Sequence, residues 1–301
     1  MAEEATLRER LYELKSMKRG EGHLSRLIDE HGSKLVAQEL WSVAAEADEE
    51  ELPKVFRAIG EAGARPLAGI VIEHGLKHRE PDVRVAAVKA LAALREPVSL
   101  SSALKDKHPA VAAAAAEGLA EMGEQAKEVA SALAEHGLQH SFPKVVRASA
   151  RALAGAGEFQ TLFEKGIGSG TDLARQEAAR ALGAAGHRGV SVIESLGLRS
   201  DSVPQRVTAA IALGKIAVGE PEGRVFAVNS LINHMYADPQ LSRTVRMECQ
   251  RQLEEAAEKL EAKGRRIRRN ASKEEKAAAE DAAFMAEMIR DALEKRRKKY
   301  D

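Results

Sequence analysis

The positions of the nine prolines constrain this chain more than any other feature of its sequence. Proline is tolerated in the first turn of a helix, where its missing N–H has no intrahelical partner, and it is strongly unfavourable in a helix interior. Six prolines open segments with helical periodicity, at intervals of 28, 28, 34, 61 and 35 residues: Pro53, Pro81, Pro109, Pro143, Pro204 and Pro239. The other three, Pro66, Pro97 and Pro221, fall where the other helix of a pair should begin.

The long interval of 61 residues is a doubled one. Thr171-Asp172-Leu173 lies within it and reads as a polar N-cap followed by the same helical pattern, which restores the register. The segments that begin at Glu73 and Glu135 are also similar to each other, at an offset of 62 residues. A unit of about 30 residues holds two short helices, and such a pair buries its apolar face only against neighbours. The sequence therefore predicts an all-α fold, an α-solenoid of about seven antiparallel helix pairs with capping helices at both ends.

Three regions follow from this register: N-terminal capping helices and a first repeat helix over residues 1–48, repeats over 49–253, and a charged helical extension over 254–301. Thr6 and Glu9 are spaced as a capping box, and so are Ser272 and Glu275. After Ser272, a narrow apolar stripe that includes Met285 and Ile289 predicts a docking helix. This helix either lies back over the last repeat, which the stripe favours, or projects as an arm for a partner.

Composition supports a helical chain and excludes several functions. Aromatic residues make up only 3% of the chain, and alanine runs such as residues 112–116 suit thin layers of closely packed helices. Lysine plus arginine equals aspartate plus glutamate, at 46 each, so the chain as a whole has no attraction to nucleic acid or anionic membrane. The single cysteine, Cys249, is expected to be a packed apolar residue. Because no apolar run approaches a membrane span, we expect a soluble, cytoplasmic protein without membrane contact.

The second helix of the predicted pair resembles that of HEAT repeats, and specifically their short, phycobilisome-lyase-like form. Pro81-Asp82-Val83-Arg84, followed by small residues and Leu91, is similar to this pattern, and weaker copies begin at Pro143 and Pro204. The resemblance extends over residues 52–253. It implies a superhelical stack, and it implies a scaffold or adaptor, because most proteins with these repeats serve in that way.

The tripeptide Glu-His-Gly occurs three times, at Glu30-His31-Gly32, Glu73-His74-Gly75 and Glu135-His136-Gly137. Two interpretations fit this recurrence. Carboxylate and imidazole pairs on stacked helices are potential metal ligands. The resemblance includes deoxyhypusine hydroxylases, whose repeats supply His-Glu dipeptides to iron, but this chain contains no His-Glu. The preferred interpretation is structural: glycine takes the left-handed conformation after a helix, and histidine in the last turn interacts with the helix dipole. We therefore expect no metal site and no cofactor.

Charge separates between the predicted second helices and the rest of the chain. The seven predicted second helices carry a formal charge of +7, and the remainder carries −7. In stacks of this kind the second helices usually line the concave surface, which predicts a basic track there. The candidate residues are Lys144, Arg147, Arg151, Arg206, Arg243, Arg246 and Arg251. Such residues either bind carboxylate or phosphate groups of a partner or pair with acidic side chains of the adjacent repeat.

Two basic clusters in the C-terminal extension are further candidates. They comprise Arg265, Arg266, Arg268 and Arg269, and Lys295, Arg296 and Arg297. Dense cationic clusters bind phosphates or acidic surfaces, although runs of this kind are often solvated helix ends. Aromatic residues, which would stack on bases, are not interleaved with them.

Three functions fit these observations, and no catalytic motif favours an enzyme. The first is a non-catalytic scaffold or adaptor whose basic surface binds an acidic segment of a protein partner. The second is a nucleic-acid-binding protein similar to HEAT-like DNA glycosylases, and the third is a bilin-lyase-like enzyme or enzyme subunit. The partner's identity and the oligomeric state are left open.

Overall fold

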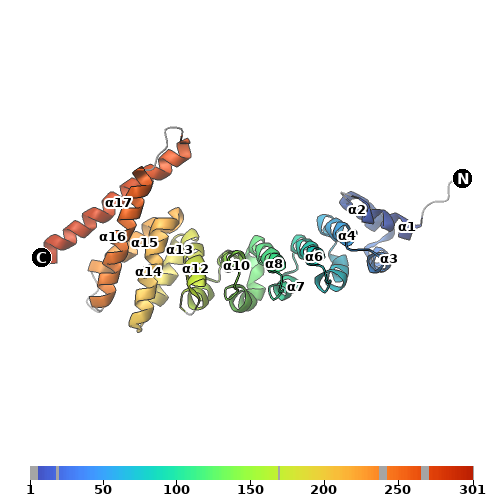
Figure 1. Ribbon diagram of the computed structural model, residues 1–301, viewed down its shortest axis with the longest axis horizontal. Helices are drawn as coiled ribbons and strands as arrows, with labels where there is room; N and C mark the ends of the chain where they lie inside the picture. The colour runs from blue at the N-terminus through green and yellow to red at the C-terminus, as the bar shows by residue number, and fades with distance from the viewer. Residues whose placement is uncertain (1–5, 18–19, 169, 237–242, 266–270, 301) are drawn as a thin grey trace. The chain divides into compact units, whose positions relative to one another are not determined.

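The computed structural model describes residues 6–17, 20–168, 170–236, 243–265 and 271–300, and these residues form helices and connecting turns with no strand (Figure 1). The chain packs as two compact units, Met1–Gly157 and Glu158–Asp301. In each unit helical segments alternate between two rows, so the chain is an α-solenoid, as predicted. The division at residue 157 falls inside the predicted repeat region.

The first unit begins with an N-terminal cap and continues as alternating rows. The cap consists of α1 (Leu7–Tyr12), which starts at the predicted capping box of Thr6 and Glu9, η1 (Glu13–Lys15) and α2 (Glu21–His31). Two first-row segments are single helices, α3 (Ser33–Ala45) and α7 (Pro97–Ala103). The other two are composite: one consists of η2 (Arg65–Leu67), α5 (Ala68–Ile70) and η3 (Val71–Leu76), and the other of η4 (Gly123–Val129), α9 (Ala130–Ala132) and η5 (Leu133–Gly137). The second-row helices are α4 (Leu52–Glu61), α6 (Pro81–Ala93), α8 (Pro109–Glu121) and α10 (Pro143–Gly155), and each packs against the next.

The second unit repeats this arrangement with longer helices. Its first-row segments are α11–η6 (Phe159–Thr161, Leu162–Gly168), α13–η7 (His187–Val192, Ile193–Leu198) and α15 (Pro221–Tyr236). Its second-row helices are α12 (Asp172–Ala184), α14 (Val203–Gly219) and α16 (Arg243–Arg265). The last helix, α17 (Lys273–Tyr300), packs along α16. Because α16 runs unbroken through residue 253, the predicted end of the repeats falls within a helix.

The proline register is confirmed for every proline that the structure describes. Pro53, Pro81, Pro109, Pro143 and Pro204 occupy the first turn of second-row helices. Pro66, Pro97 and Pro221 occupy the first turn of first-row segments, whereas Pro239 lies outside the described residues. Thr171 is the predicted N-cap of α12, since its hydroxyl accepts a hydrogen bond from the backbone N–H of Ala174.

The glycines of the Glu-His-Gly triplets do not all have the predicted conformation. Gly32 has a positive φ of 80° after α2, although its ψ of 146° is extended and not that of the left-handed helix. The prediction is wrong for Gly75 and Gly137, which lie in the π-helical turns η3 and η5 and do not have positive φ. Their role is close packing: a Cβ on either would come within 3.0 Å of side-chain atoms of the second-row residue twelve positions later, which is Ala87 or Ser149.

The same close contact recurs in the second unit. Gly197 in η7 faces Ala209 on α14 at the same twelve-residue spacing, and a Cβ on Gly197 would also come within 3.0 Å of Ala209. In each case a glycine on the first row meets a small side chain on the second row, so the two rows approach almost to backbone contact. This contact sets the distance between the first-row and second-row helices of one repeat.

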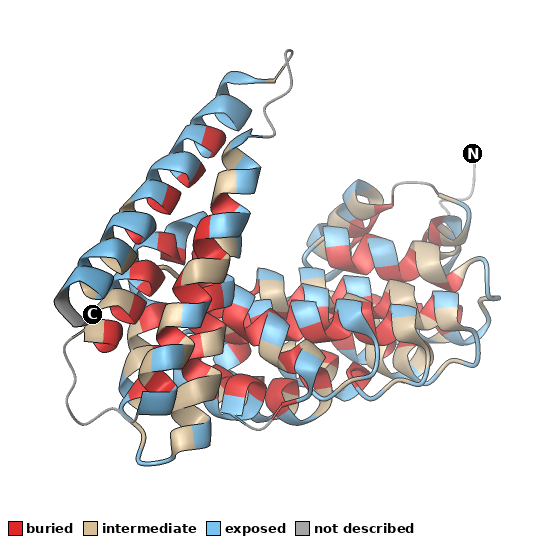
Figure 2. Ribbon diagram, turned by 60° about the vertical axis from the view of Figure 1, so that its left-hand side comes forward, coloured by how far each residue is buried: buried red, intermediate tan, exposed pale blue. Residues whose placement is uncertain are grey.

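The core of each unit is a thin apolar layer between the two rows. Buried residues form stripes that face inward, while the outer faces of the helices are exposed (Figure 2). On α8 the layer is built from alanines, including Ala112, Ala115 and Ala116, and these let the neighbouring helices pack closely. Among the described residues, no helix combines the length and apolar character needed to cross a bilayer.

Helix α17 lies back on the last repeat, which is the first of the two arrangements that the sequence left open. Its buried stripe, which includes Met285 and Ile289, packs along α16. Arg224 of α15 is buried, donates a hydrogen bond from Nε to the carbonyl of Ala217 at 3.1 Å, and pairs with Asp281 of α17. The predicted capping box of Ser272 and Glu275 starts this helix.

Candidate partner-binding surface

The histidines of the Glu-His-Gly triplets lie at helix ends. His74 packs edge-on against Trp41, with ring centroids 4.9 Å apart, and burial lowers the pKa of His74. Within the described residues, no group of three or more histidine, cysteine, aspartate or glutamate side chains is arranged to hold a metal ion.

Cys249 is fully buried on α16. Burial raises the pKa of its thiol to about 12. Since the thiolate is the nucleophilic form of cysteine, this residue has the environment of a packed apolar side chain.

We expect Cys249 in the folded protein to resist dithiobis(nitrobenzoate) at about pH 8. The reaction should be slower by on the order of a thousandfold than in concentrated guanidinium chloride, because little thiolate forms when the pKa is near 12. Absorbance of the released thionitrobenzoate measures the rate. Reaction of the folded protein at the rate of a free thiol would contradict the burial of Cys249.

Three basic residues form a stripe on α10, the last second-row helix of the first unit. Lys144, Arg147 and Arg151 are spaced three and four residues apart, which places them on one face of the helix. All three are exposed. Lys144 and Arg151 make no hydrogen bond or ion pair with the described part of the chain. Their charges are thus available to a partner. We call Lys144, Arg147 and Arg151 the α10 stripe.

Arginines at the start of second-row helices have a different role, because they fasten the preceding turn. Arg206 donates from Nη1 to the carbonyl of Ser200 at 2.7 Å, and Arg175 donates in the same way to Gly170 at 2.6 Å. Arg84 donates to two carbonyls of the turn before α6 and also pairs with Asp106, which lies before the next second-row helix, α8. Arg206, a predicted partner-binding residue, is therefore engaged within the fold.

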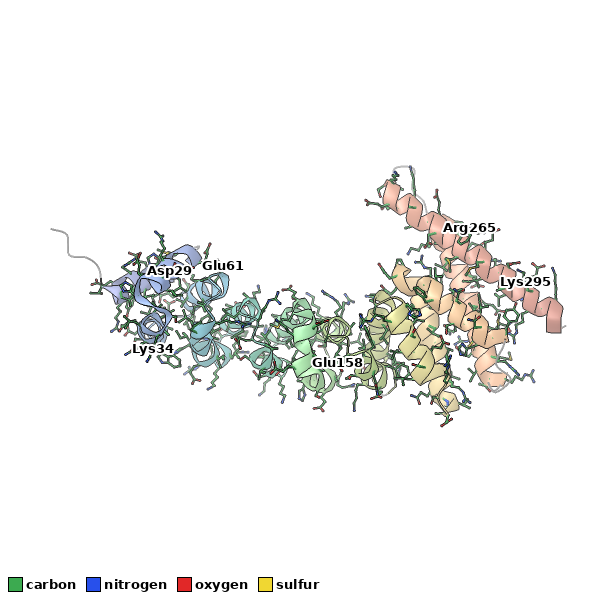
Figure 3. The ribbon with its side chains drawn as sticks, turned by 180° about the vertical axis from the view of Figure 1, so that it is seen from behind. Asp29, Lys34, Glu61, Glu158, Arg265 and Lys295 are labelled. Atoms are coloured by element: carbon green, nitrogen blue, oxygen red, sulfur yellow. The ribbon has the colours of Figure 1, made fainter. Side chains whose placement is uncertain are left out.

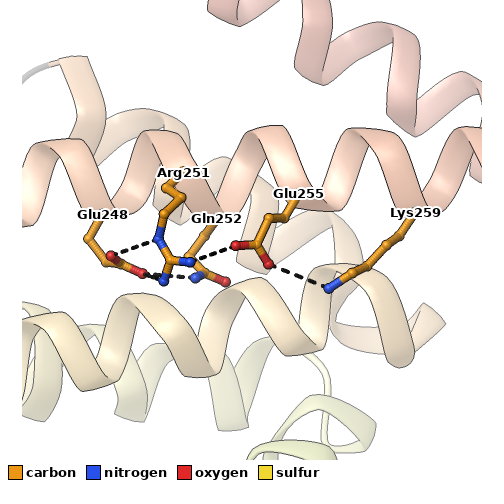
Figure 4. A network of polar contacts seen from close by, with 5 residues as sticks. All are labelled: Glu248, Arg251, Gln252, Glu255 and Lys259. Atoms are coloured by element: carbon orange, nitrogen blue, oxygen red, sulfur yellow. Dashed lines mark hydrogen bonds and ion pairs between the residues drawn. The ribbon is translucent and has the colours of Figure 1, made fainter.

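Arg251 is also engaged within the fold. Its guanidinium lies between two carboxylates of its own helix, those of Glu248 at 2.5 Å and Glu255 at 2.7 Å (Figure 4). Lys259 continues the network by pairing with Glu255 at 3.5 Å. The charge of Arg251 is thus compensated locally, in contrast to the charges of Lys144 and Arg151.

Arg243 and Arg246, also on α16, line a pocket of about 420 Å³ together with Arg296 of α17. Met235 and Tyr236 at the end of α15, and Met247 and Gln250 on α16, complete the lining. Neither Arg243 nor Arg246 makes a hydrogen bond or ion pair with any residue that the structure describes. We call this the three-arginine pocket. The sequence assigned its arginines to two separate groups, and neither Tyr236 nor Gln250 was a candidate.

The predicted C-terminal clusters are only partly described. Arg265 pairs with Glu261 at 2.9 Å, and Lys295 pairs with Asp291 at 2.6 Å; both are exposed and lie at different positions along the hairpin of α16 and α17 (Figure 3). Arg297 is exposed and makes no such pair with the described residues. Arg266, Arg268 and Arg269 lie outside the described residues, so a joint basic surface at this site stays a prediction.

The segment from η3 into α10 is similar in sequence to a known family of repeats. Residues 71–154 match the family model of HEAT repeats. This match covers the closely packed pairs around Gly75 and Gly137 and ends within α10, one residue before that helix ends. The matched segment lies in the first unit, and the α10 stripe is on its last helix.

Comparisons over the whole chain give weaker likenesses. No curated protein matches the sequence. An engineered protein of known crystal structure is 18% identical, with 92% of this chain and 97% of that chain covered and a TM-score of 0.32. A chain from a computational design of self-assembling cyclic homo-oligomers is 17% identical, with 98% and 94% covered and a TM-score of 0.22. At these TM-scores neither structure bears on the function of this protein.

Proposed function

We propose that this protein is a non-catalytic scaffold or adaptor that binds an acidic segment of a protein partner on its second-row helices. The observation that carries the proposal is the α10 stripe, in which Lys144 and Arg151 are exposed and have no acidic partner among the described residues. Long cationic side chains on one face of a helix attract an extended acidic peptide and speed its association. The HEAT repeats that end in α10 supply an extended, rigid surface for such contacts.

A charge-reversal experiment tests this proposal. The wild-type protein and a Lys144→Glu/Arg151→Glu variant are used to capture proteins from nuclease-treated extract of cells that express the chain. We expect the reversal to weaken binding of the captured partner by on the order of tenfold or more, since it replaces two attractions with two repulsions. Titration of the identified partner against both proteins measures the loss.

The matched control is Lys34→Glu/Lys105→Glu, which makes the same change in net charge. Both lysines are exposed, and they lie on α3 and just after α7, so neither is on a second-row helix. We expect this variant to retain the affinity of the wild-type protein within about twofold. Equal losses in both variants, or the absence of any captured protein, would contradict the proposal. A partner that disappears on nuclease treatment would instead indicate nucleic acid binding.

A further inference from the structure

The three-arginine pocket brings three positive charges together at one place in the second unit. Arg243, Arg246 and Arg296 line it, and no carboxylate of the described residues is part of its lining. Like charges that share a pocket repel one another, so an anion that enters it relieves this repulsion as well as forming new hydrogen bonds. The pocket is therefore suited to an anionic group.

Contacts around the pocket hold one of its arginines in place before any ligand arrives. Arg296 donates from Nη1 to Oε1 of Gln250, and Gln250 is itself oriented by a hydrogen bond from its Nε2 to Glu254 at 2.9 Å. Tyr236 donates its hydroxyl proton to the carbonyl of Ala292, which fastens α17 against the end of α15. An arginine that is already oriented loses less side-chain entropy when it binds a ligand.

The lining also has an apolar part. Met235 and Met247 flank the arginines, and the Met247 side chain is 54% exposed. Methionine adapts to differently shaped apolar groups and is common at surfaces that bind peptides. A ligand that fits this pocket thus carries an anionic group next to apolar atoms, as a peptide side chain and its neighbours do.

We propose that the three-arginine pocket binds a phosphorylated side chain of a protein partner. A phosphomonoester carries nearly two negative charges and three acceptor oxygens, which matches three guanidinium groups better than a carboxylate does. A nucleic acid phosphate carries a single charge and continues as a chain on both sides, so it uses a single local pocket less well than an extended track. The inference rests on the proposed function only in that the ligand belongs to a protein.

Binding of degenerate peptides tests the inference without knowledge of the partner. The probes are fluorescein-labelled peptide libraries with a central phosphoserine, serine or glutamate and degenerate flanking positions, and fluorescence anisotropy of the full-length protein is the readout. We expect the phosphoserine library to bind at least about tenfold more tightly than the other two. Equal affinities for the three libraries would overturn the proposal.

Two variants locate the binding. Arg243→Gln/Arg246→Gln should remove the preference for phosphoserine, whereas Arg297→Gln should retain it within about twofold, because Arg297 is exposed on α17 and does not line the pocket. A phosphoserine preference that persists in Arg243→Gln/Arg246→Gln would overturn the assignment to this pocket. Competition with a single-stranded oligonucleotide is a second check. If the oligonucleotide displaces the labelled phosphoserine library from the wild-type protein at a lower concentration than the unlabelled library does, the assignment is also overturned.

The α10 stripe variant separates this inference from the proposed function. Lys144→Glu/Arg151→Glu should bind the phosphoserine library as the wild-type protein does, since the stripe is on a different helix in the other unit. Loss of the partner in that variant with an unchanged phosphoserine preference supports both proposals. An intact phosphoserine preference with no acidic partner would contradict the proposed function alone.

Discussion

Replacing Gly75 with alanine is expected to destabilise the first unit by about 3 kcal/mol. The new Cβ would come within 3.0 Å of Ala87 and lie 2.9 Å from Cε2 of Phe56. Phe56 and Ala87 are fully buried, so neither side chain has room to move aside, and the two rows must separate. Urea unfolding followed by the fluorescence of Trp41, the chain's single tryptophan, measures the effect, because Trp41 lies in the first unit against His74.

Two further variants make this expectation specific. Gly22→Ala is the control, since a Cβ on Gly22 of α2 meets no atom within 4 Å, and alanine there should be neutral or stabilise the helix by up to about 1 kcal/mol. The double variant Gly75→Ala/Ala87→Gly should lose less free energy of unfolding than the two single variants lose in sum, by about 1 kcal/mol or more. Additive losses would show that Gly75 and Ala87 do not limit the spacing of the rows.

Replacing Arg84 with methionine is expected to destabilise the first unit by about 3 kcal/mol as well. Arg84 donates to Asp106 at 2.7 and 3.0 Å, and to the carbonyls of His78 and Arg79 at 2.9 and 2.7 Å. The two side chains of the pair are only 15% and 14% exposed, so the variant removes the guanidinium from a largely buried carboxylate and from two carbonyls, and Asp106 keeps only the hydrogen bond from the backbone N–H of His108. The control is Lys77→Met, whose exposed pair with Glu73 is screened by solvent, so its loss should leave the stability nearly unchanged.

The stability lost in Arg84→Met should depend on pH. Burial works to raise the pKa of Asp106, but hydrogen bonds from Arg84 and from the backbone N–H of His108 outweigh it and hold the pKa below its usual value. A carboxyl whose pKa is lowered by folding stabilises the fold above its unfolded pKa, about 3.9, and this stabilisation is lost as pH falls through the folded pKa. Because the unfolded chain titrates alike in both proteins, the gap should be full where Asp106 is ionised in both and should shrink toward acid pH, as Asp106 becomes protonated in the variant before it does in the wild type. A gap that is constant with pH would contradict the role of this ion pair.

The helix starts were predictable because each depends on the chemistry of one or two residues. Proline lacks an N–H wherever it stands. The Thr171 hydroxyl caps its helix by accepting a hydrogen bond from the backbone N–H of Ala174, three residues later. The glycine contacts were less visible, although the sequence carries a signal for them. Glycine stands twelve residues before alanine or serine in Gly75 and Ala87, Gly137 and Ser149, and Gly197 and Ala209. Glycine at a helix end suggests a left-handed turn first, and only packing reveals the close approach.

The sequence by itself determined the fold, because proline, capping and apolar spacing repeat in register and act locally. It could not determine which arginines are available, since that depends on what folding places beside each one. Arg206, Arg246 and Arg251 were all candidates for the same basic track, yet the first fastens a turn, the second lines a pocket, and the third lies between two carboxylates. Arg296 joins Arg246 only because α17 folds back along α16, fifty residues later in the chain. Charge is a property of the residue, but its environment is a property of the tertiary structure.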